Sequence, residues 1–370
     1  MSFLVLKFGG SSVGTIARMG NVSSIIHNLL TRGHKVVVVV SAMHGVTNQL
    51  LELTKNFIDI SSDRECDVVV STGEQVTSGL LALSLKKIGV LAKSFQGWQV
   101  PVITETVFGE ASIKSVNKDI LIGAILEGIV PIVSGFQGIS NRNDITTIGR
   151  GGSDATAVAI ANALQADECF IYTDVDGVYT ADPRIVLGAC KLECISYSEM
   201  LEMSKKGSKV LQAKSVQIAQ DNGVKLRVLS SFKDNDVGTA VGGGATKYPT
   251  KNAAIAGIAN DMNSFMLKTN NKNFKKKSIP MTEIDEKTFV INKIHQNEVK
   301  NTVGEFDNDI GIVSVIGQDS INLNQRILKS LRNNKIVVKK IYSSDKSLSI
   351  VTPFQQTEIA VNILHKEFFE

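Results

Sequence analysis

The chain has 370 residues, of which 43% are hydrophobic and 21% charged, with a formal net charge of +4. This length predicts two or more domains, and the composition is that of an ordinary soluble globular protein. The charge is uneven, since residues 1–250 hold 23 basic and 23 acidic residues whereas residues 251–370 hold 17 and 13. One lysine cluster, at 272–277, is more typical of a solvated loop than of a nucleic-acid surface. We therefore expect no nucleic-acid partner.

The four cysteines are too few for a disulfide framework, and Cys190 and Cys194 have no histidine close by in the sequence. We therefore expect no zinc site and no other metal held by the protein alone. No basic and apolar leader precedes Gly10, and the longest charge-poor stretch, 121–140, contains Glu127 and Pro131. These features predict neither a signal peptide nor a membrane span, and they favour a cytoplasmic location.

Residues 1–232 alternate apolar runs of strand type with amphipathic segments of helix type. Such alternation predicts a mainly parallel sheet with helices on both faces. The expected strands are 3–6, 36–40, 91–95, 129–134, 169–173 and 225–229. The expected helices are 15–30, 48–57, 79–88, 116–127, 153–165 and 208–222. Residues 67–70 fit either a strand or a helix that runs towards Gly73 and Glu74, and the periodicity leaves both open.

The polar, glycine-rich stretch 233–252 is typical of a linker. After it we expect strands at 254–258, 312–316, 335–342 and 347–351, with helices at 323–333 and 355–368. The β-α-β-β-α order from 312 onwards, with the extra strand before it, predicts a small ferredoxin-like unit. The predicted organisation is therefore an α/β domain at 1–232, a linker at 233–252 and an α+β region at 253–370.

The first predicted strand runs directly into the turn Lys7-Phe8-Gly9-Gly10-Ser11-Ser12. Glycines leave backbone N–H groups uncovered, and a helix that begins here would direct its positive end to the same place. The turn is not the common P-loop, because the lysine precedes the glycines. Two glycines after a strand more often form an ordinary turn. A phosphate site is thus a hypothesis that needs a second anion-binding element.

A second glycine pair occurs in Gly149-Arg150-Gly151-Gly152-Ser153-Asp154, directly before a predicted helix. Ligands of parallel α/β sheets bind beyond the carboxyl ends of the strands. The turns expected there carry five charged residues: Lys7, Glu74, Arg150, Asp154 and Asp174. Each has an ordinary explanation by itself, such as a helix cap for Asp154 or a turn for Asp174. Together they favour one polyanion held from two sides.

Six motifs follow one another across residues 3–232. They are Lys7-Phe-Gly-Gly-Ser-Ser, Ser41-Ala-Met-His-Gly-Val-Thr47-Asn, Ser71-Thr-Gly-Glu74-Gln, Gly135-Phe136-Gln-Gly, Gly149-Arg150-Gly-Gly-Ser153-Asp154 and Tyr172-Thr-Asp174-Val-Asp-Gly-Val-Tyr179-Thr-Ala-Asp-Pro-Arg184. In this order they resemble the aspartate kinases of the amino-acid-kinase superfamily. The first motif is shared with glutamate, acetylglutamate and uridylate kinases, whereas those around Glu74 and Arg150 are more specific. Ser11 stands where the family usually has threonine.

The resemblance implies a three-layer α-β-α sandwich and an enzyme that transfers the γ-phosphoryl group of ATP to the side-chain carboxylate of L-aspartate. The product, 4-phospho-L-aspartate, opens the aspartate-derived pathway to lysine, threonine and methionine. ATP and Mg²⁺ are the expected nucleotide and cofactor. The acceptor carboxylate, with a pKa of about 3.9, is already ionised at neutral pH, so that no general base is needed.

The resemblance also implies a role for each motif residue. Lys7 would act on the transferred phosphoryl group, Asp154 would orient Lys7, Arg150 would clamp the aspartate α-carboxylate, and Glu74 would pair with its ammonium group. The remaining aspartate-side positions are Ser41, Thr47, Phe136 and Ser153. The ATP-side positions, besides Lys7, are Gly9, Gly10, Gly151, Gly152, Thr173, Asp174, Tyr179, Arg184 and Lys209.

The region from 253 resembles the ACT regulatory region of the same family. Residues 310–370 cover most of one ACT unit, whereas the partner unit, at about 260–305, is reduced and has no counterpart of the usual first helix. We expect a homodimer through the ACT region and no feedback inhibition by lysine or threonine. Two alternatives remain: a sibling kinase with another acceptor, and a non-catalytic regulator that binds amino acids. The second predicts a damaged site, yet Lys7, Arg150 and Asp154 are all present.

Overall fold

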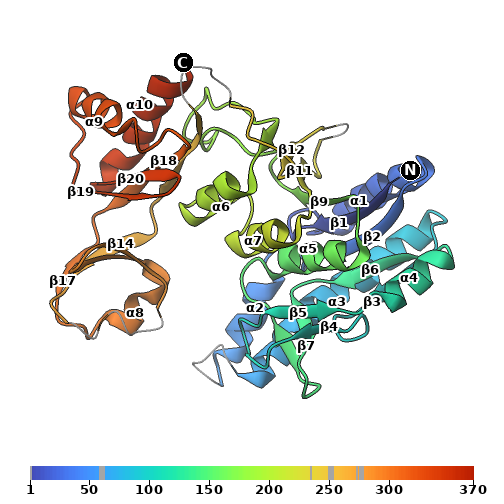
Figure 1. The fold of residues 1–370 in the computed structure, drawn as a ribbon. Coiled ribbons are helices and arrows are strands. Elements are labelled where there is room, and N and C mark those ends of the chain that lie inside the picture. The colour runs from blue at the N-terminus through green and yellow to red at the C-terminus, as the bar shows by residue number, and fades with distance from the viewer. Residues whose placement is uncertain (1, 58–62, 234–235, 249–253, 272–273, 275–278) are drawn as a thin grey trace. The chain divides into compact units, whose positions relative to one another are not determined.

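The computed structural model describes residues 2–57, 63–233, 236–248, 254–271, 274 and 279–370 (Figure 1). The chain forms two compact units. The N-terminal unit comprises Met1–Val178, Glu193–Tyr197 and Val210–Ala245, and the C-terminal unit comprises Tyr179–Leu192, Ser198–Lys209 and Thr246–Glu370. The chain thus enters the C-terminal unit twice before residue 210, which the predicted boundary at 232 did not anticipate.

The N-terminal unit is built on an eight-stranded sheet of order β10-β12-β11-β9-β1-β2-β6-β3. Its six predicted strands are confirmed, and they pair in parallel throughout. They are β1 (Phe3–Phe8), β2 (Lys35–Val40), β3 (Ala92–Phe95), β6 (Val130–Ser134), β9 (Glu168–Thr173) and β11 (Leu226–Ser230). The strands β12 (Thr239–Val241) and β10 (Cys194–Ile195) extend one edge, so that part of the expected linker belongs to the sheet.

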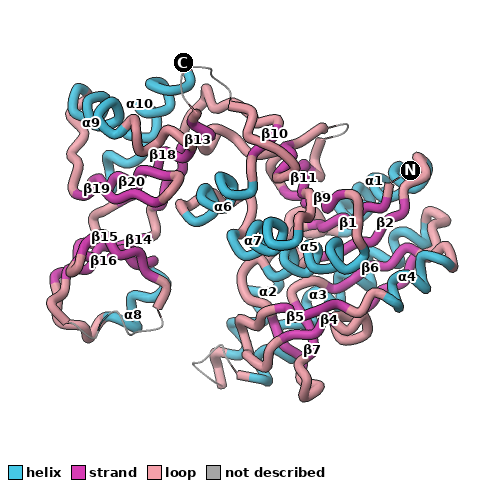
Figure 2. The backbone as a smooth tube through the Cα atoms, in the orientation of Figure 1, coloured by secondary structure: helices cyan, strands magenta, loops and turns pink. Residues whose placement is uncertain are grey.

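Helices cover both faces of this sheet, as the alternation of elements predicted (Figure 2). Apolar residues of α1 (Ile16–Thr31) and α3 (Arg64–Lys87) pack on Leu4, Leu6 and Phe8 of β1. Since strand side chains alternate between faces, Lys7 points to the opposite side, where α5 (Gly152–Leu164) packs on β1. The other helices are α2 (Val46–Thr54), α4 (Asp119–Leu126) and α7 (Ala213–Asn222).

The long helix α3 settles the ambiguity at residues 67–70 and corrects the position expected for Glu74. The side chain of Asp63 accepts a hydrogen bond from the Glu65 N–H at 2.8 Å and caps this helix, so residues 64–87 continue as one helix. Glu74 therefore lies in mid-helix and not at a strand end. Among the described residues, α3 is long and apolar enough to span a membrane, but half of its apolar window is buried within the unit.

A second, small sheet in the N-terminal unit has the order β5-β4-β7-β8. Its strands, β4 (Val102–Thr104), β5 (Ile113–Val116), β7 (Gln137–Ile139) and β8 (Ile145–Thr147), were not predicted. Strands of three or four residues are too short to show an alternating pattern. The hairpin of β7 and β8 brings the chain from Phe136 to Arg150, and thus joins two of the motifs.

The C-terminal unit contains the predicted β-α-β-β-α arrangement. An antiparallel sheet of order β13-β18-β20-β19 carries α9 (Asn324–Asn333) and α10 (Thr357–Phe369). Its strands are β13 (Ile255–Asp261), β18 (Gly311–Gly317), β19 (Lys340–Ser344) and β20 (Ser347–Thr352), and a short turn of helix, η3 (Phe354–Gln356), precedes α10. The strand expected from 335 begins only at Lys340, and Lys335 lies in the turn after α9 with a positive φ of 58°. The helix α6 (Tyr197–Lys205) was not predicted.

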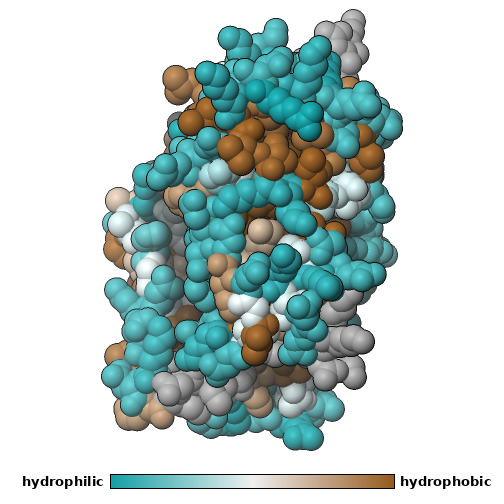
Figure 3. Space-filling view, turned by 90° about the vertical axis from the view of Figure 1, so that its left-hand side faces the viewer, coloured by the Kyte–Doolittle hydropathy of each residue, from teal (hydrophilic) through white to brown (hydrophobic). Residues whose placement is uncertain are grey.

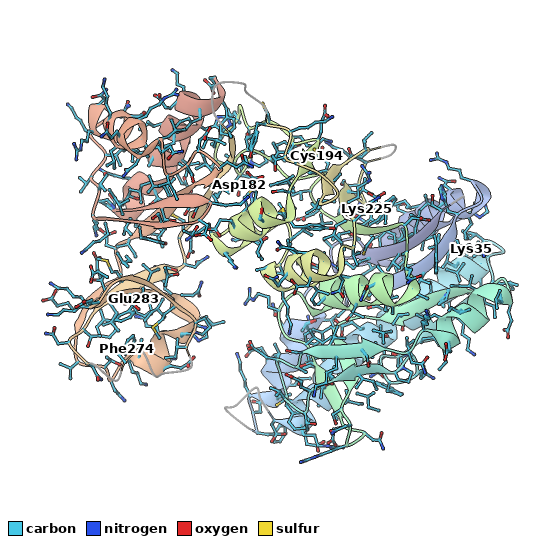
Figure 4. All side chains as sticks on the ribbon, in the orientation of Figure 1. Lys35, Asp182, Cys194, Lys225, Phe274 and Glu283 are labelled. Carbon is cyan, nitrogen blue, oxygen red and sulfur yellow. The ribbon has the colours of Figure 1, made fainter. Side chains whose placement is uncertain are left out.

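The part expected to be a reduced ACT unit forms its own four-stranded sheet, of order β15-β16-β14-β17. Its elements are β14 (Ser264–Lys268), β15 (Met281–Asp285), β16 (Thr288–Asn292), η2 (Lys293–His295), α8 (Gln296–Val299) and β17 (Glu305–Asp307). A separate core fills it, with Phe265, Phe274 and Phe289 among its buried members, and Phe274 is labelled in Figure 4. Between β14 and β15 the described residues contain no α-helix.

Candidate active site

Lys7 and Asp154, which are 147 positions apart in the sequence, form an ion pair in the N-terminal unit. The Lys7 Nζ lies 2.6 Å from the Asp154 Oδ1, and the two residues are only 8% and 7% exposed. Lys7 comes from β1 and Asp154 from the first turn of α5. The two glycine-rich motifs therefore converge at one place, beside the positive end of a helix. A buried charge of this kind needs its partner, since an unpaired one costs several kcal/mol.

The glycines beside this pair leave space that any other residue would fill. A Cβ at Gly10 would lie 2.9 Å from the Ala42 carbonyl oxygen, and one at Gly9 would lie 3.3 Å from the Lys7 Nζ. Gly151 has a φ of +75°, and a Cβ there would lie 2.3 Å from the Gln212 Cγ. Gly10, which faces a backbone oxygen, and Gly151, with its positive φ, accept only glycine without rearrangement, whereas a side chain at Gly9 would press on the Lys7 ammonium group.

The expectation that four glycine N–H groups face the phosphates needs correction. The Gly9 N–H donates to the Tyr172 carbonyl oxygen at 3.2 Å, and the Gly152 N–H donates to that of Gly149 at 2.9 Å. These two bonds shape the turns. Gly10 and Gly151 have no backbone hydrogen bond from their N–H groups to the described residues, so these two remain as candidate donors to an anion.

Glu74 is buried, with 2% of its surface exposed. Its Oε1 accepts a hydrogen bond from the Ala42 N–H at 2.9 Å, whereas its Oε2 has no partner among the described residues. Burial raises the pKa of this carboxyl group to about 7, because a low-dielectric surrounding disfavours the charged form. Ala42 lies two residues after the end of β2, so Glu74 reaches a strand end from a helix. One unsatisfied buried oxygen makes this carboxylate a receptor for a cation.

Phe136 and Ser153 are brought together at the start of α5. Phe136 adopts a positive φ of 67°, rare for a bulky residue, and its N–H donates to the Thr156 Oγ1 at 3.2 Å. A Cβ at Gly135 would lie 2.8 Å from the Ser153 Cβ, and a Cβ at Gly152 would lie 2.9 Å from the Phe136 ring. This tight packing fixes the backbone on both sides of the turn that carries Arg150.

Arg150, Ser41 and Thr47 are the remaining positions expected around aspartate. Arg150 is exposed in the turn between β8 and α5. Ser41 follows β2 with its N–H bonded to the Phe8 carbonyl oxygen at 3.1 Å, and Thr47 lies in the first turn of α2, which packs against α3. All three belong to the N-terminal unit, together with Lys7 and Glu74.

The positions expected for the nucleotide divide between the two units. Thr173 and Asp174 follow β9 in the N-terminal unit, and the Thr173 Oγ1 donates to the Asp174 Oδ1 at 2.9 Å. Tyr179, Arg184 and Lys209 belong to the C-terminal unit. There the Arg184 guanidinium pairs with Asp182 at 2.6 Å, and Arg184, followed by Lys209, lowers the pKa of that carboxyl group. Arg184 and Lys209 are therefore neighbours of one carboxylate.

The sequence predicted no role for Ser231 or for Ser12 of the first motif. The Ser231 Oγ lies 2.7 Å from the Ser12 Oγ, its N–H donates to the Thr173 carbonyl oxygen at 3.1 Å, and both serines are buried. Ser231 thus ties the glycine turn after β1 to the ends of β9 and β11. The signal was available, because Ser230 and Ser231 end a predicted strand in the same way as the other motifs.

The sequence model of the amino acid kinase family matches residues 2–230. This match contains Lys7, Asp154 and every strand of the main sheet except β12.

The chain belongs to the amino acid kinase family.

Among relatives of this amino acid kinase, an aspartate kinase of Pseudomonas putida is 39% identical over 100% of this chain and 98% of its own length. Aspartokinase 2 of Bacillus subtilis is 34% identical, again over 100% and 98%. Among solved structures, aspartokinase III of E. coli in complex with aspartate and ADP matches with a TM-score of 0.81 and 24% identity over the full length of both chains. At that identity the likeness shows the fold.

Proposed function

We propose that the chain catalyses the ATP-dependent phosphorylation of the side-chain carboxylate of L-aspartate, giving 4-phospho-L-aspartate and ADP. This reaction is the first step of the aspartate-derived biosynthesis of lysine, threonine and methionine. The full-length relatives at 34–39% identity carry the name aspartate kinase or aspartokinase. The observation that carries the proposal is the buried Lys7–Asp154 pair between two glycine turns, with the unsatisfied Glu74 carboxylate in the same unit.

The chemistry asks the enzyme mainly to bring two anions together and to neutralise charge on the phosphoryl oxygens. Lys7, oriented by Asp154, supplies a positive charge for the transferred group, and the N–H groups of Gly10 and Gly151 supply donors for the phosphates. On the acceptor side, Arg150 clamps the α-carboxylate of aspartate and Glu74 receives its ammonium group. The side-chain carboxylate then attacks the γ-phosphorus, and the bond to ADP breaks.

ATP is expected to bind with Mg²⁺, which offsets phosphate charge when it is bound. Among the described residues, no group of three or more His, Cys, Asp or Glu side chains could hold a metal ion. The donors present therefore fit a magnesium ion held mostly by the phosphates and water rather than by the protein. Lys7 and the glycine N–H groups remain the protein's own contribution to charge stabilisation.

An assay of ADP release with and without L-aspartate tests the function. We expect release that depends on aspartate, with little activity on glutamate, acetylglutamate or UMP in its place. Activity on one of those acceptors would favour the sibling-kinase alternative. Tight aspartate binding without ADP release would favour the regulator alternative.

Protonation of Glu74 predicts a pH dependence of the aspartate KM. A carboxyl group with a pKa of about 7 is mostly neutral at pH 6 and mostly ionised at pH 8. The ammonium group of aspartate needs the ionised form, so the aspartate KM should fall about tenfold from pH 6 to pH 8. The ATP KM should stay nearly constant over the same range. In Glu74→Gln the aspartate KM should be high and independent of pH. A steep profile that survives in this variant would assign the titration to another group.

Ionisation of Glu74, which should improve aspartate binding, should lower the free energy of unfolding. The folded state raises the Glu74 pKa from 4.5 to about 7, so it binds more protons than the unfolded state between these values. The free energy of unfolding should therefore fall by roughly 3 kcal/mol from this group as the pH rises through that window. Denaturant unfolding of the wild type and of Glu74→Gln at pH 5 and pH 8 measures it. The variant should lose less stability than the wild type.

We further propose a homodimer through the C-terminal unit. β19 is the edge strand of its sheet, and a groove beside it is lined by Leu328, Ile336, Val338 and Ile341 together with the basic residues Arg332, Lys339 and Lys340. Figure 3 shows apolar residues gathered among polar ones in the upper half of its view. An edge strand next to a partly apolar groove suits pairing with a second copy. Sedimentation should give a dimer, and Ile341→Lys should shift it towards monomer. A wild-type monomer would reject the proposal.

We propose a cytoplasmic location, because the four cysteines, Cys66, Cys169, Cys190 and Cys194, form no disulfide bond with one another. Two of them, Cys66 and Cys169, are buried. Free thiols are typical of a reducing compartment. The apolar helix α3 packs in the core with Asp67 and Glu74 buried on it, as expected of a helix in a soluble protein.

The small sheet of the reduced ACT unit predicts resistance to feedback inhibition. ACT units of the family commonly hold effector amino acids at a loop and first helix, which have no counterpart in the sequence of this unit. We expect the activity at saturating substrates to change by less than about twofold with millimolar lysine or threonine, alone or together. Strong inhibition by either amino acid would show that an effector site persists.

A further inference from the structure

The chain reaches the turn that carries Arg150 through Thr147 and Ile148, and side chains from two helices hold these residues. The first is Asp67 of α3, which is only 2% exposed. Its Oδ2 accepts from the Thr147 N–H at 2.7 Å, and its Oδ1 accepts from the Thr147 Oγ1 at 2.7 Å. Both oxygens also accept from the Gly109 N–H at 3.1 Å. Asp67 is thus a buried carboxylate whose two oxygens are both used within the N-terminal unit.

Lys214 of α7 holds the next residue of the same segment. Its Nζ donates to the Ile148 carbonyl oxygen at 3.0 Å and to the Ala111 carbonyl oxygen at 2.8 Å. The Ala111 N–H in turn donates to the Thr147 carbonyl oxygen at 2.8 Å. The two loop segments are therefore bonded to each other and to both helices, directly before the turn begins at Gly149.

Glu74 lies on the same helix as Asp67 and on the same face. Seven positions separate the two residues, which is about two turns of an α-helix, or roughly 10 Å along its axis. Asp67 has donors at both oxygens, whereas the Glu74 Oε2 has no partner among the described residues. Asp67 therefore fits a structural anchor, and Glu74 fits a receptor for a cationic group of a ligand.

The start of α5, which follows the Arg150 turn, lies close to Glu74. The Ser134 Oγ lies 3.1 Å from the Glu74 carbonyl oxygen. The next residue, Gly135, packs so tightly that a Cβ there would lie 2.8 Å from the Ser153 Cβ. The turn with Arg150 is thus held at its beginning by α3 and at its end beside Ser134. Helix α3 therefore sets the position of an exposed cation, Arg150, relative to an unsatisfied buried anion, Glu74.

We propose that Asp67 is a positioning residue for the acceptor amino acid, which fixes the Arg150 turn relative to Glu74. The proposal rests on the proposed function, in that the ammonium and α-carboxylate groups of the amino acid are taken to bind at Glu74 and Arg150. Asp67 itself touches neither substrate. It raises the fraction of molecules whose turn is in the binding conformation, and the apparent affinity for the amino acid rises with that fraction.

Asp67→Asn tests this role with little change in side-chain shape. The variant replaces one acceptor oxygen with an NH2 group, which would face the N–H donors of Thr147 and Gly109. The aspartate KM should rise about five- to twentyfold, whereas kcat and the ATP KM should change by less than about twofold. Thr147→Val removes only the hydroxyl bond and should shift the aspartate KM less, in the same direction. It provides the same test if Asp67→Asn does not fold.

A double-mutant cycle shows whether Asp67 acts through Arg150. In Arg150→Ala the guanidinium is already absent, so the position of the turn matters little. Adding Asp67→Asn to that variant should raise the aspartate KM by less than about a further twofold. Full additivity of the two losses would overturn the proposal, because Asp67 would then act independently of Arg150.

Ser23→Ala is the matched control, because it removes another tether of α3. The Ser23 Oγ lies 2.8 Å from the Ser84 Oγ of α3, and Ser23 is buried on α1. We expect this variant to lower the melting temperature and to leave the aspartate KM unchanged. An equal rise of the aspartate KM in Ser23→Ala would overturn the proposal, since any loosening of α3 would then have the same effect.

Two measurements without turnover separate this proposal from the proposed reaction. Calorimetric titration with L-aspartate should show a five- to twentyfold loss of affinity in Asp67→Asn. Amide hydrogen exchange at residues 147–152 should be faster in Asp67→Asn and unchanged in Ser23→Ala. Unchanged affinity or unchanged exchange in folded Asp67→Asn would overturn the proposal, as would a wild type that binds no aspartate. A wild type that binds aspartate without releasing ADP would count only against the proposed reaction.

Discussion

Lys7→Met is expected to lower kcat by about a hundredfold to a thousandfold, with much smaller changes in either KM. The variant removes the one lysine found next to Asp154 in the buried pair, at the point where both glycine turns meet. The Lys7 ammonium group stabilises the transition state, in which charge shifts among the phosphoryl oxygens, more than it stabilises bound ATP. Its removal therefore lowers kcat more than it weakens binding. Steady-state kinetics with both substrates varied gives the measurement.

The same variant leaves the Asp154 carboxylate buried without its partner, which should lower the stability by about 3–5 kcal/mol. The double variant Lys7→Met with Asp154→Asn removes both charges and should recover much of that stability but none of the activity. Lys35→Met is the matched control, because Lys35 is exposed at the opposite end of the neighbouring strand (Figure 4). Near-normal kcat in folded Lys7→Met would refute the catalytic role of Lys7.

Arg150→Ala should raise the aspartate KM by about ten- to a hundredfold, because a charged hydrogen-bonded clamp on the α-carboxylate is lost. The ATP KM should stay within about twofold of the wild-type value. Arg150→Lys should recover only part of the affinity, since an ammonium group cannot form the two parallel bonds of a guanidinium.

The exposed Arg142, in the turn between β7 and β8, gives a control for loss of surface charge. Arg142→Ala should leave the aspartate KM unchanged. An unchanged aspartate KM in Arg150→Ala would reject the clamp and move the α-carboxylate to another donor. A matching rise in the ATP KM would instead indicate that Arg150 lies at the nucleotide.

A run such as Val36–Val40 has no amphipathic pattern that could be confused with a surface helix, and all six runs of this kind became strands of the main sheet. The convergence of Lys7 and Asp154 was also predicted, although the turn before Asp154 follows β8 of the small sheet and not a strand of the main sheet. The family match and the full-length relatives then agreed with the function class that these motifs indicated.

The predictions that the structure corrects failed for a common physical reason. In each case contacts between segments remote in sequence, and not the local sequence pattern, determine the structure. Glu74 was expected at a strand end but lies in mid-helix, and only the hydrogen bond from Ala42 shows how it reaches the end of β2. The Gly9 and Gly152 N–H groups are used within the turns, which no sequence pattern reveals. The small β5-β4-β7-β8 sheet and the packing of residues 179–192 depend on contacts between segments remote in sequence.

The interleaved course of the chain has a practical consequence for anyone who wishes to isolate a catalytic fragment. A fragment that ends at residue 232 would lack β12 at the edge of the main sheet. It would keep Ala181 and Val186 but lack the other residues of the core in which they are buried. The fragment would keep Lys7, Glu74, Arg150 and Asp154 but would expose apolar surface at two places. We therefore expect that truncation after residue 232 gives a fragment that aggregates and does not turn over substrate.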